Sequence, residues 1–237
     1  MLKPMALALA SFLVVTSSLA GDLTLTYRMS GKGTHNKSEQ FDSQGGETIT
    51  QYVSQTKARV VQPYIKSEGL FDFENGIIYT IDHKRKTITK MSVATLDKMG
   101  SLLGSFGLGG KSSGSEEVKV EQLGPDTVLG RPCKKIRISV QGFVEELSLD
   151  PSLQFPVSYH KFMNLFGNMP GEVSGIMKRM GEAISKQKGV PLRTHVTGRS
   201  LDTTHVAISI STAPLPPSTW ELPKGYKVTE MSGAFPN

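Results

Sequence analysis

Alternation of apolar and polar side chains with a period of two is the feature that most limits what this chain can fold into. Between Leu23 and Met29 the odd positions are apolar and the even positions are Thr or Arg, as in a strand with one buried face and one face in water. Similar segments recur at short intervals, at 48–54, 58–62, 69–74, 77–82, 87–91, 118–123, 135–140, 144–150, 193–197 and 206–211, with a last one near Trp220. Short strands joined by tight turns predict an antiparallel meander. Because strands and helices do not alternate regularly, a doubly wound nucleotide-binding fold is disfavoured.

Two polar segments mark turns between these strands. Asn75-Gly76 separates two apolar runs, and this dipeptide accepts the positive φ angles of a type I′ turn. It therefore predicts a hairpin. The charged segment 83–86 is interpreted as the tip of the next hairpin.

Two helical insertions interrupt the meander. Residues 94–106 carry apolar side chains at helical spacing and lead into a stretch rich in Gly and Ser. The longer insertion spans 159–188, where apolar residues from Val173 onward fall on one arc of a helix, with charged residues opposite. Residues 21–237 are expected to form a single domain, since 237 residues with 38% hydrophobic content can bury one full core.

Residues 1–20 have the layout of a secretory signal peptide. Lys3 precedes the apolar run 5–15, and small residues lead to a cleavage point after Ala20. The alternative, a membrane anchor, is weaker because this run falls short of the roughly 20 residues that span a bilayer. The protein is therefore expected to be soluble in the periplasm or outside the cell.

The single cysteine of the chain, Cys133, excludes an internal disulfide. Flanking Arg131 and Lys134 could lower the pKa of its thiol. We favour a half-buried strand residue that acts as a small hydrophobe.

Positive charge is concentrated in residues 151–200, which hold seven Lys or Arg and two acidic residues, a net charge of +5. Lys178, Arg179 and Lys186 lie opposite the apolar arc of the predicted helix. Such a patch attracts anionic partners over about 8–10 Å. The alternative is a solvated helix face without a partner.

Motifs for catalysis and for cofactors are weak. Gly110-Lys111-Ser112 resembles the end of a phosphate-binding loop, but Ser105 stands where the first glycine belongs. The five histidines form no helical zinc pair, and no nucleophile elbow is present. Aromatic residues do not interleave with the basic ones as nucleic-acid binding requires. These patterns predict a protein that is not an enzyme and needs no cofactor. A hydrolase is the least favoured of the three functions considered, after the two binding functions described below.

The segments 126–136, 145–150, 189–194 and 221–226 resemble a family of uncharacterised exported bacterial domains that is akin to the periplasmic lipoprotein carriers of the LolA/LolB type. The resemblance implies a mainly β (α+β) fold, in which a strongly curved antiparallel sheet forms an incomplete barrel closed by amphipathic helices. It also implies an apolar cavity, which holds acyl chains in the carriers. The family has no established ligand or catalytic residues to transfer to this chain.

The leading hypothesis is an exported, non-enzymatic protein that binds a lipid or another apolar ligand between the curved sheet and a helical lid. The candidate lining residues are Phe162, Met163, Phe166, Ile176, Met177, Met180 and Ile184. Lys178, Arg179 and Lys186 are the candidates for an anionic head group. The alternative is an envelope interaction protein whose basic helix docks on an anionic membrane surface or a protein partner, without an internal ligand.

Overall fold

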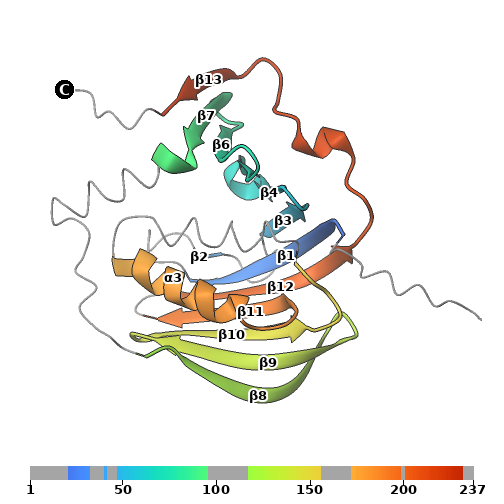
Figure 1. Cartoon of the computed structure of the whole chain (residues 1–237), viewed down its shortest axis with the longest axis vertical. Coiled ribbons are helices and arrows are strands. Elements are labelled where there is room, and N and C mark those ends of the chain that lie inside the picture. Colours follow the sequence, from blue (N-terminus) through green and yellow to red (C-terminus); the bar gives the residue numbers. More distant parts are fainter. Residues whose placement is uncertain are drawn as a thin grey trace, which may run out of the picture.

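The computed structural model describes residues 21–32, 40–41, 47–95, 117–155, 172–198 and 201–231. In these ranges thirteen strands form one sheet (Figure 1). The strands are β1 (Leu23–Lys32), β2 (Gln40–Phe41), β3 (Thr48–Val53), β4 (Lys57–Gln62), β5 (Ser67–Asp72), β6 (Ile77–Asp82), β7 (Thr87–Ser92), β8 (Lys119–Val128), β9 (Arg131–Val140), β10 (Phe143–Asp150), β11 (Val190–Gly198), β12 (Leu201–Ser211) and β13 (Lys227–Glu230). The helical elements are α3 (Glu172–Ser185), the short 3₁₀ turns η1 (Pro63–Ile65) and η2 (Pro217–Trp220), and the helical residues 93–95 that follow β7.

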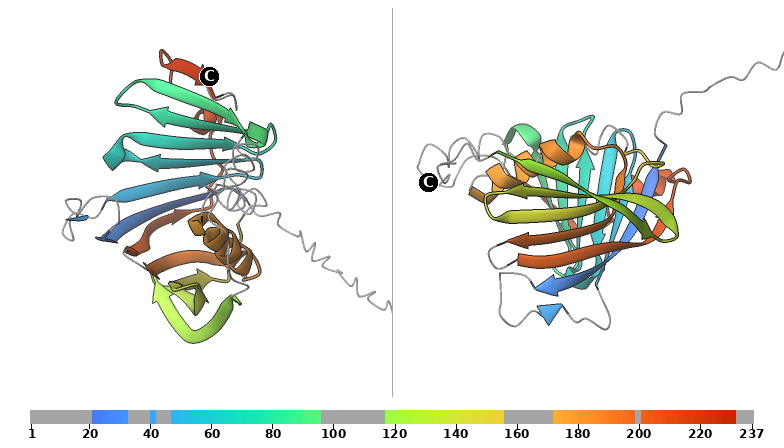
Figure 2. Two further views of the ribbon diagram at one scale, coloured as in Figure 1. Left: turned by 90° about the vertical axis from the view of Figure 1, so that its left-hand side faces the viewer. Right: turned by 90° about the horizontal axis from the view of Figure 1, so that it is seen from below.

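The sheet is curved and open. Its order is β13-β7-β6-β5-β4-β3-β1-β12-β11-β10-β9-β8, with β2 pairing β1 outside this path. The two ends, β13 and β8, do not pair with each other, and the strands coil around a concave side (Figure 2). The mainly β, curved and unclosed sheet is as expected from the sequence.

The closing strand differs from the prediction. Trp220 lies in η2, and the last strand is β13, which pairs with β7 in parallel whereas the described pairs elsewhere in the sheet are antiparallel. The physical reason lies in Pro214, Pro216 and Pro217, since proline has no N–H to donate to a sheet ladder. The chain therefore crosses the sheet before it pairs again.

The hairpin at Asn75-Gly76 is confirmed, but its turn is not the expected two-residue type. A four-residue loop, 73–76, joins β5 to β6, and Gly76 has a positive φ of 62° whereas Asn75 does not. The carboxylate of Asp72 accepts hydrogen bonds from the backbone and side-chain nitrogens of Asn75. These bonds fix the loop without a left-handed Asn.

The predicted amphipathic helix is confirmed as α3. Its buried side chains Ile176, Met180 and Ala183 pack against apolar residues of β9 and β10. We call the face of the sheet that carries α3 the inner face. Residues 159–171 and most of the predicted helix 94–106 lie outside the described residues, as does the predicted signal peptide, so closure of the sheet by helices stays a prediction.

Cys133 is a buried residue of β9, as the strand interpretation requires. Burial raises the pKa of its thiol, which stays protonated at neutral pH. It packs in a cluster with Leu23, Leu25, Val190 and Leu192, where β1, β9 and β11 converge.

The outer face of β4 to β7 is covered by the C-terminal segment. The guanidinium of Arg59 donates to the carboxylate of Glu68 and to the backbone carbonyls of Thr219 and Glu221. His83 lies between the other oxygen of Glu68 (2.7 Å) and the hydroxyl of Tyr226 (2.9 Å). The segment 83–86 does form the predicted hairpin tip; in addition, it anchors the C-terminal segment.

Candidate ligand site on the inner face of the sheet

Strand pairing places one row of side chains across the middle of the inner face. Leu147 of β10 is opposite Thr194 of β11, and Thr194 is opposite His205 of β12. His205 is in turn opposite Met29 of β1, whose backbone N–H donates to the carbonyl of Glu47. Neighbouring strands lie about 4.8 Å apart, so segments from both ends of the chain contribute to a single surface.

Glu145 begins the neighbouring row on the same face. It lies between Phe143 and Leu147 along β10, both of which belong to the cluster under α3. Its cross-strand partners are Ile138 of β9 and Val196 of β11. A carboxyl group is thus placed on a surface that is otherwise mostly apolar.

Burial alone shapes the electrostatics of Glu145. It raises the pKa of the carboxyl from an ordinary 4.5 to about 7, because the charged form loses its hydration. Within the described part of the chain, no ion pair or hydrogen bond to this carboxyl offsets the loss. At neutral pH the neutral and ionised forms are therefore about equally populated.

Two more polar groups face this side of the sheet. Burial lowers the pKa of His205, so its imidazole is neutral at pH 7. Gln51 of β3 is opposite Leu25 of β1, and its buried side-chain oxygen accepts no hydrogen bond from the described residues. Buried polar atoms normally have partners, so the oxygen of Gln51 has unused capacity to accept a hydrogen bond.

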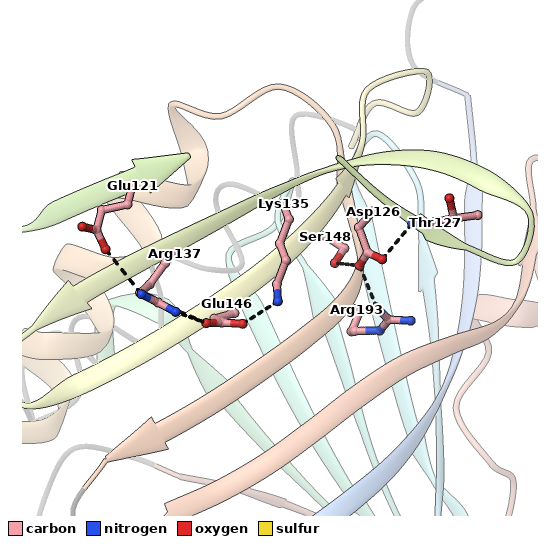
Figure 3. Close-up of polar contacts among 8 residues, drawn as sticks. All are labelled: Glu121, Asp126, Thr127, Lys135, Arg137, Glu146, Ser148 and Arg193. Atoms are coloured by element: carbon pink, nitrogen blue, oxygen red, sulfur yellow. Dashed lines mark hydrogen bonds and ion pairs between the residues drawn. The ribbon is translucent and has the colours of Figure 1, made fainter. Parts of the chain in front are cut away.

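The outer face of the same strands is different, because its charges neutralise one another (Figure 3). Glu146, the neighbour of Glu145, accepts hydrogen bonds from Lys135 (2.7 Å) and Arg137 (2.6 Å). These bonds lower the pKa of the Glu146 carboxyl. Glu121 completes this group through Arg137.

A second compensated group lies beside the first (Figure 3). Asp126 of β8 accepts hydrogen bonds from the hydroxyl of Ser148 (2.5 Å) and from Arg193 (2.6 Å). The bond from Ser148 is the main cause of the lowered pKa of Asp126. Arg193 therefore pairs with an acid on the outer face, although it counts toward the net charge of residues 151–200.

The candidate residues on α3 occupy several environments. Ile176 and Met180 are 1% and 3% exposed and contact the sheet, while Ile184 is partly buried at the same cluster. Arg179 donates a hydrogen bond of 2.7 Å to the side-chain oxygen of Gln141, and Lys186 is exposed just after the helix. Phe162, Met163 and Phe166, together with the side chains of Met177 and Lys178, lie outside the described residues.

The two C-terminal histidines do not come together. His195 is opposite Thr204, one position away from the pair that contains His205, so the two imidazoles point to opposite faces. His195 instead lies 2.9 Å from the carboxylate of Asp202. Among the described residues, no group of three or more His, Cys, Asp or Glu side chains is placed to hold a metal ion.

Membrane spans are also absent from this part of the chain: no helix that the structure describes is both long enough and apolar enough to cross a bilayer.

Sequence reasoning missed Glu145, Gln51 and His205. The sequence signal for Glu145 was its position in the strand, because alternate residues share a face and Glu145 alternates with Phe143, Leu147 and Leu149. The dipeptide Glu145-Glu146 looks like a solvated charge pair, but in a strand its two members face opposite sides of the sheet.

A family model described as a domain of unknown function, DUF4412, matches residues 20–226. The chain belongs to the DUF4412 family. The expected membership in a family of uncharacterised domains is thereby confirmed. Among curated proteins, none matches the sequence of this DUF4412 domain.

Several solved structures are similar to the DUF4412 domain. An uncharacterised conserved protein from Thermus thermophilus has 12% identity and a TM-score of 0.48, and the match covers 90% of this chain and 92% of that one. MucB from the Pseudomonas aeruginosa MucA/MucB complex has 12% identity and a TM-score of 0.45, with 88% and 58% covered. A domain from Vibrio parahaemolyticus named for outer membrane lipoprotein sorting has 10% identity and a TM-score of 0.36, with 84% and 89% covered.

The DUF4412 domain also matches PNGF-II with 17% identity and a TM-score of 0.46; the match covers 90% of this chain but spans only 32% of the PNGF-II chain. All four TM-scores lie below 0.5.

Proposed function

We propose that this protein is a non-enzymatic binding protein that takes an apolar or amphipathic ligand on the inner face of its sheet. The observation that carries the proposal is the contrast between the two faces of β9 to β11. Charged side chains on the outer face neutralise one another, whereas the inner face combines apolar side chains with the carboxyl of Glu145, which has no ion-pair or hydrogen-bond partner among the described residues. A surface of this kind fits a small-molecule site, in which apolar contacts surround a few polar groups.

Helix α3 forms one wall of the proposed site. Ile176 and Met180 pack against the sheet and Ile184 lies partly buried beside them, and we propose that Phe162, Met163, Phe166 and Met177 extend this apolar wall. Each CH₂ group of a ligand buried there contributes about 0.8 kcal/mol. A short acyl chain is therefore sufficient for useful affinity.

We further propose that the protein acts after export, in the periplasm or outside the cell, with residues 1–20 as its signal peptide. The layout of these residues supports this part of the proposal. N-terminal sequencing of the protein from its own host tests it, and an intact Met1 would contradict it.

Native mass spectrometry and dye displacement test the binding. Protein purified from its host is expected to carry an apolar adduct, and dodecanol is expected to displace N-phenyl-1-naphthylamine, a neutral apolar dye. Thr203 and Thr204 offer a matched pair, because the first is opposite Val196 on the inner face and the second faces outward. Thr203→Glu should abolish displacement and Thr204→Glu should leave it unchanged. A ligand-free spectrum together with no displacement refutes the proposal.

The alternative role, docking on an anionic membrane surface through Lys178, Arg179 and Lys186, is supported by the exposure of Lys186 and Lys188 after α3. Co-sedimentation with vesicles of anionic phospholipid distinguishes the two roles. Loss of sedimentation in Lys186→Gln with intact dye displacement favours docking, whereas lost displacement favours the ligand site.

A further inference from the structure

Glu145 differs from the other acids of strands β8 to β10 in what faces it. Glu121, Asp126, Glu146 and Asp150 each contact a basic side chain. The groups that face Glu145 are Ile138 on β9, Val196 on β11, and Thr203 with the neutral His205 on β12. The described side chains of α3 nearest this face, Ile176, Met180 and Ala183, are apolar, and Arg179 is directed to Gln141.

We propose that the inner-face site takes an amphipathic ligand with a cationic amine, and that the carboxylate of Glu145 receives this ammonium group. This inference rests on the proposed function and specifies the chemical class of its ligand. The apolar part of the ligand would lie against the partly buried side chains of Val196 on β11 and Ile184 on α3, and the ammonium group would lie at Glu145.

The available polar atoms favour a cation over an anion. The carboxylate of Glu145 accepts hydrogen bonds, as the N–H donors of an ammonium group require. The basic side chains of β9 and β11 that form ion pairs, Arg131, Lys135, Arg137 and Arg193, pair with acids other than Glu145. An anionic head group at Glu145 would meet like charge without a compensating cation from these strands.

Loss of hydration at the Glu145 carboxylate gives the site its preference for a cation. A carboxylate buried without a partner is unfavourable, and a cation that enters the same site restores a favourable ionised state. Ammonium binding therefore requires the deprotonated carboxyl, which releases its proton to solvent. Since this carboxyl titrates near pH 7, the affinity for an amine should fall up to about tenfold for each pH unit below 7.

Calorimetric titration of the purified full-length protein with dodecylamine and dodecanol tests the inference, because the two probes share one chain and differ in charge. At pH 8 the wild type should bind dodecylamine at least about tenfold more tightly than dodecanol, as expected for a buried charge-assisted pair. Glu145→Gln should remove this preference, so that the variant binds the two probes with similar affinity. Glu146→Gln, on the opposite face, is the matched control and should retain the preference.

The outcomes separate the two proposals. Equal affinity for both probes, or a preference that survives in Glu145→Gln, overturns the amine assignment and leaves the apolar site in place. If neither probe binds, the proposed function itself fails. The pH profile of dodecylamine affinity in the wild type is a second measurement that needs no variant, and a flat profile between pH 8 and pH 5 also overturns the assignment.

Discussion

The carboxyl of Glu145 should make the stability of this protein depend on pH in a way that one substitution removes. Its pKa is about 7 in the folded protein and 4.5 in an unfolded chain. The folded state therefore holds its proton more tightly than the unfolded state between these two values. Stability is highest below pH 4.5 as far as this group is concerned, falls as the pH rises through the window, and reaches its lower limit above pH 7.

The size of the effect follows from the same two values. Each pKa unit corresponds to about 1.4 kcal/mol, so the ionised carboxyl lowers the free energy of unfolding by about 3 kcal/mol above pH 7. Glu145→Gln keeps the shape of the neutral acid and cannot ionise. The variant should match the wild type near pH 4.5 and exceed it by about 3 kcal/mol at pH 8.

Urea denaturation followed by circular dichroism, repeated from pH 4.5 to pH 8.5, measures this difference. Other titrating groups, such as His205, are common to both proteins and cancel in the comparison. Glu146→Gln is the control in which the effect on stability has the opposite sign, because Lys135 and Arg137 lower the pKa of the Glu146 carboxyl. The wild type should therefore be more stable than this control at neutral pH, and the difference in the free energy of unfolding should disappear as the pH falls. Parallel curves for the wild type and Glu145→Gln would refute the burial of this carboxyl.

Three further predictions concern the scaffold. Arg59→Ala removes the donor to the carbonyls of Thr219 and Glu221; it should cost about 1–3 kcal/mol and speed hydrogen exchange in 227–230, whereas unchanged exchange there would contradict the anchoring role. Met180→Ala should destabilise the protein by about 2–5 kcal/mol because the Met180 side chain is buried. The control Lys186→Ala changes an exposed side chain and should cost less than about 0.5 kcal/mol. Equal urea midpoints for the two variants would count against the packing of α3. The buried, protonated thiol of Cys133 should react with a disulfide reagent only on unfolding; rapid reaction in native buffer would show that it is accessible.

Local sequence signals located most of the strands, because each strand is bounded by its own turn. The segment 77–82 was expected with the same limits as β6, and Asn75-Gly76 marked the hairpin before it. β13 was missed because each of its four residues is exposed, so it has no apolar alternation to detect. Its position depends on contacts of the C-terminal segment with Arg59 and His83, which no local pattern encodes.

The candidate site was less accessible to sequence reasoning than the fold. The apolar arc of α3 was readable, and Ile176 and Met180 do face the sheet. The polar groups were not readable, because Met29 meets His205 only through a register between strands at opposite ends of the chain. A one-residue slip would move Glu145 or His205 to the other face.

The central place of β1 in the sheet has a consequence for how the chain folds. β3 to β7 form one run of sequential neighbours and β8 to β12 form another, and β1 joins the two by pairing with β3 and β12. Each run can assemble from local hairpins, whereas pairing Thr24 with Ser211 closes a loop that contains most of the chain. We expect the two runs to form first and dock on β1 last. Until β12 emerges, one edge of β1 stays open to pairing with other chains, so the slowest step in folding is also the one most exposed to aggregation.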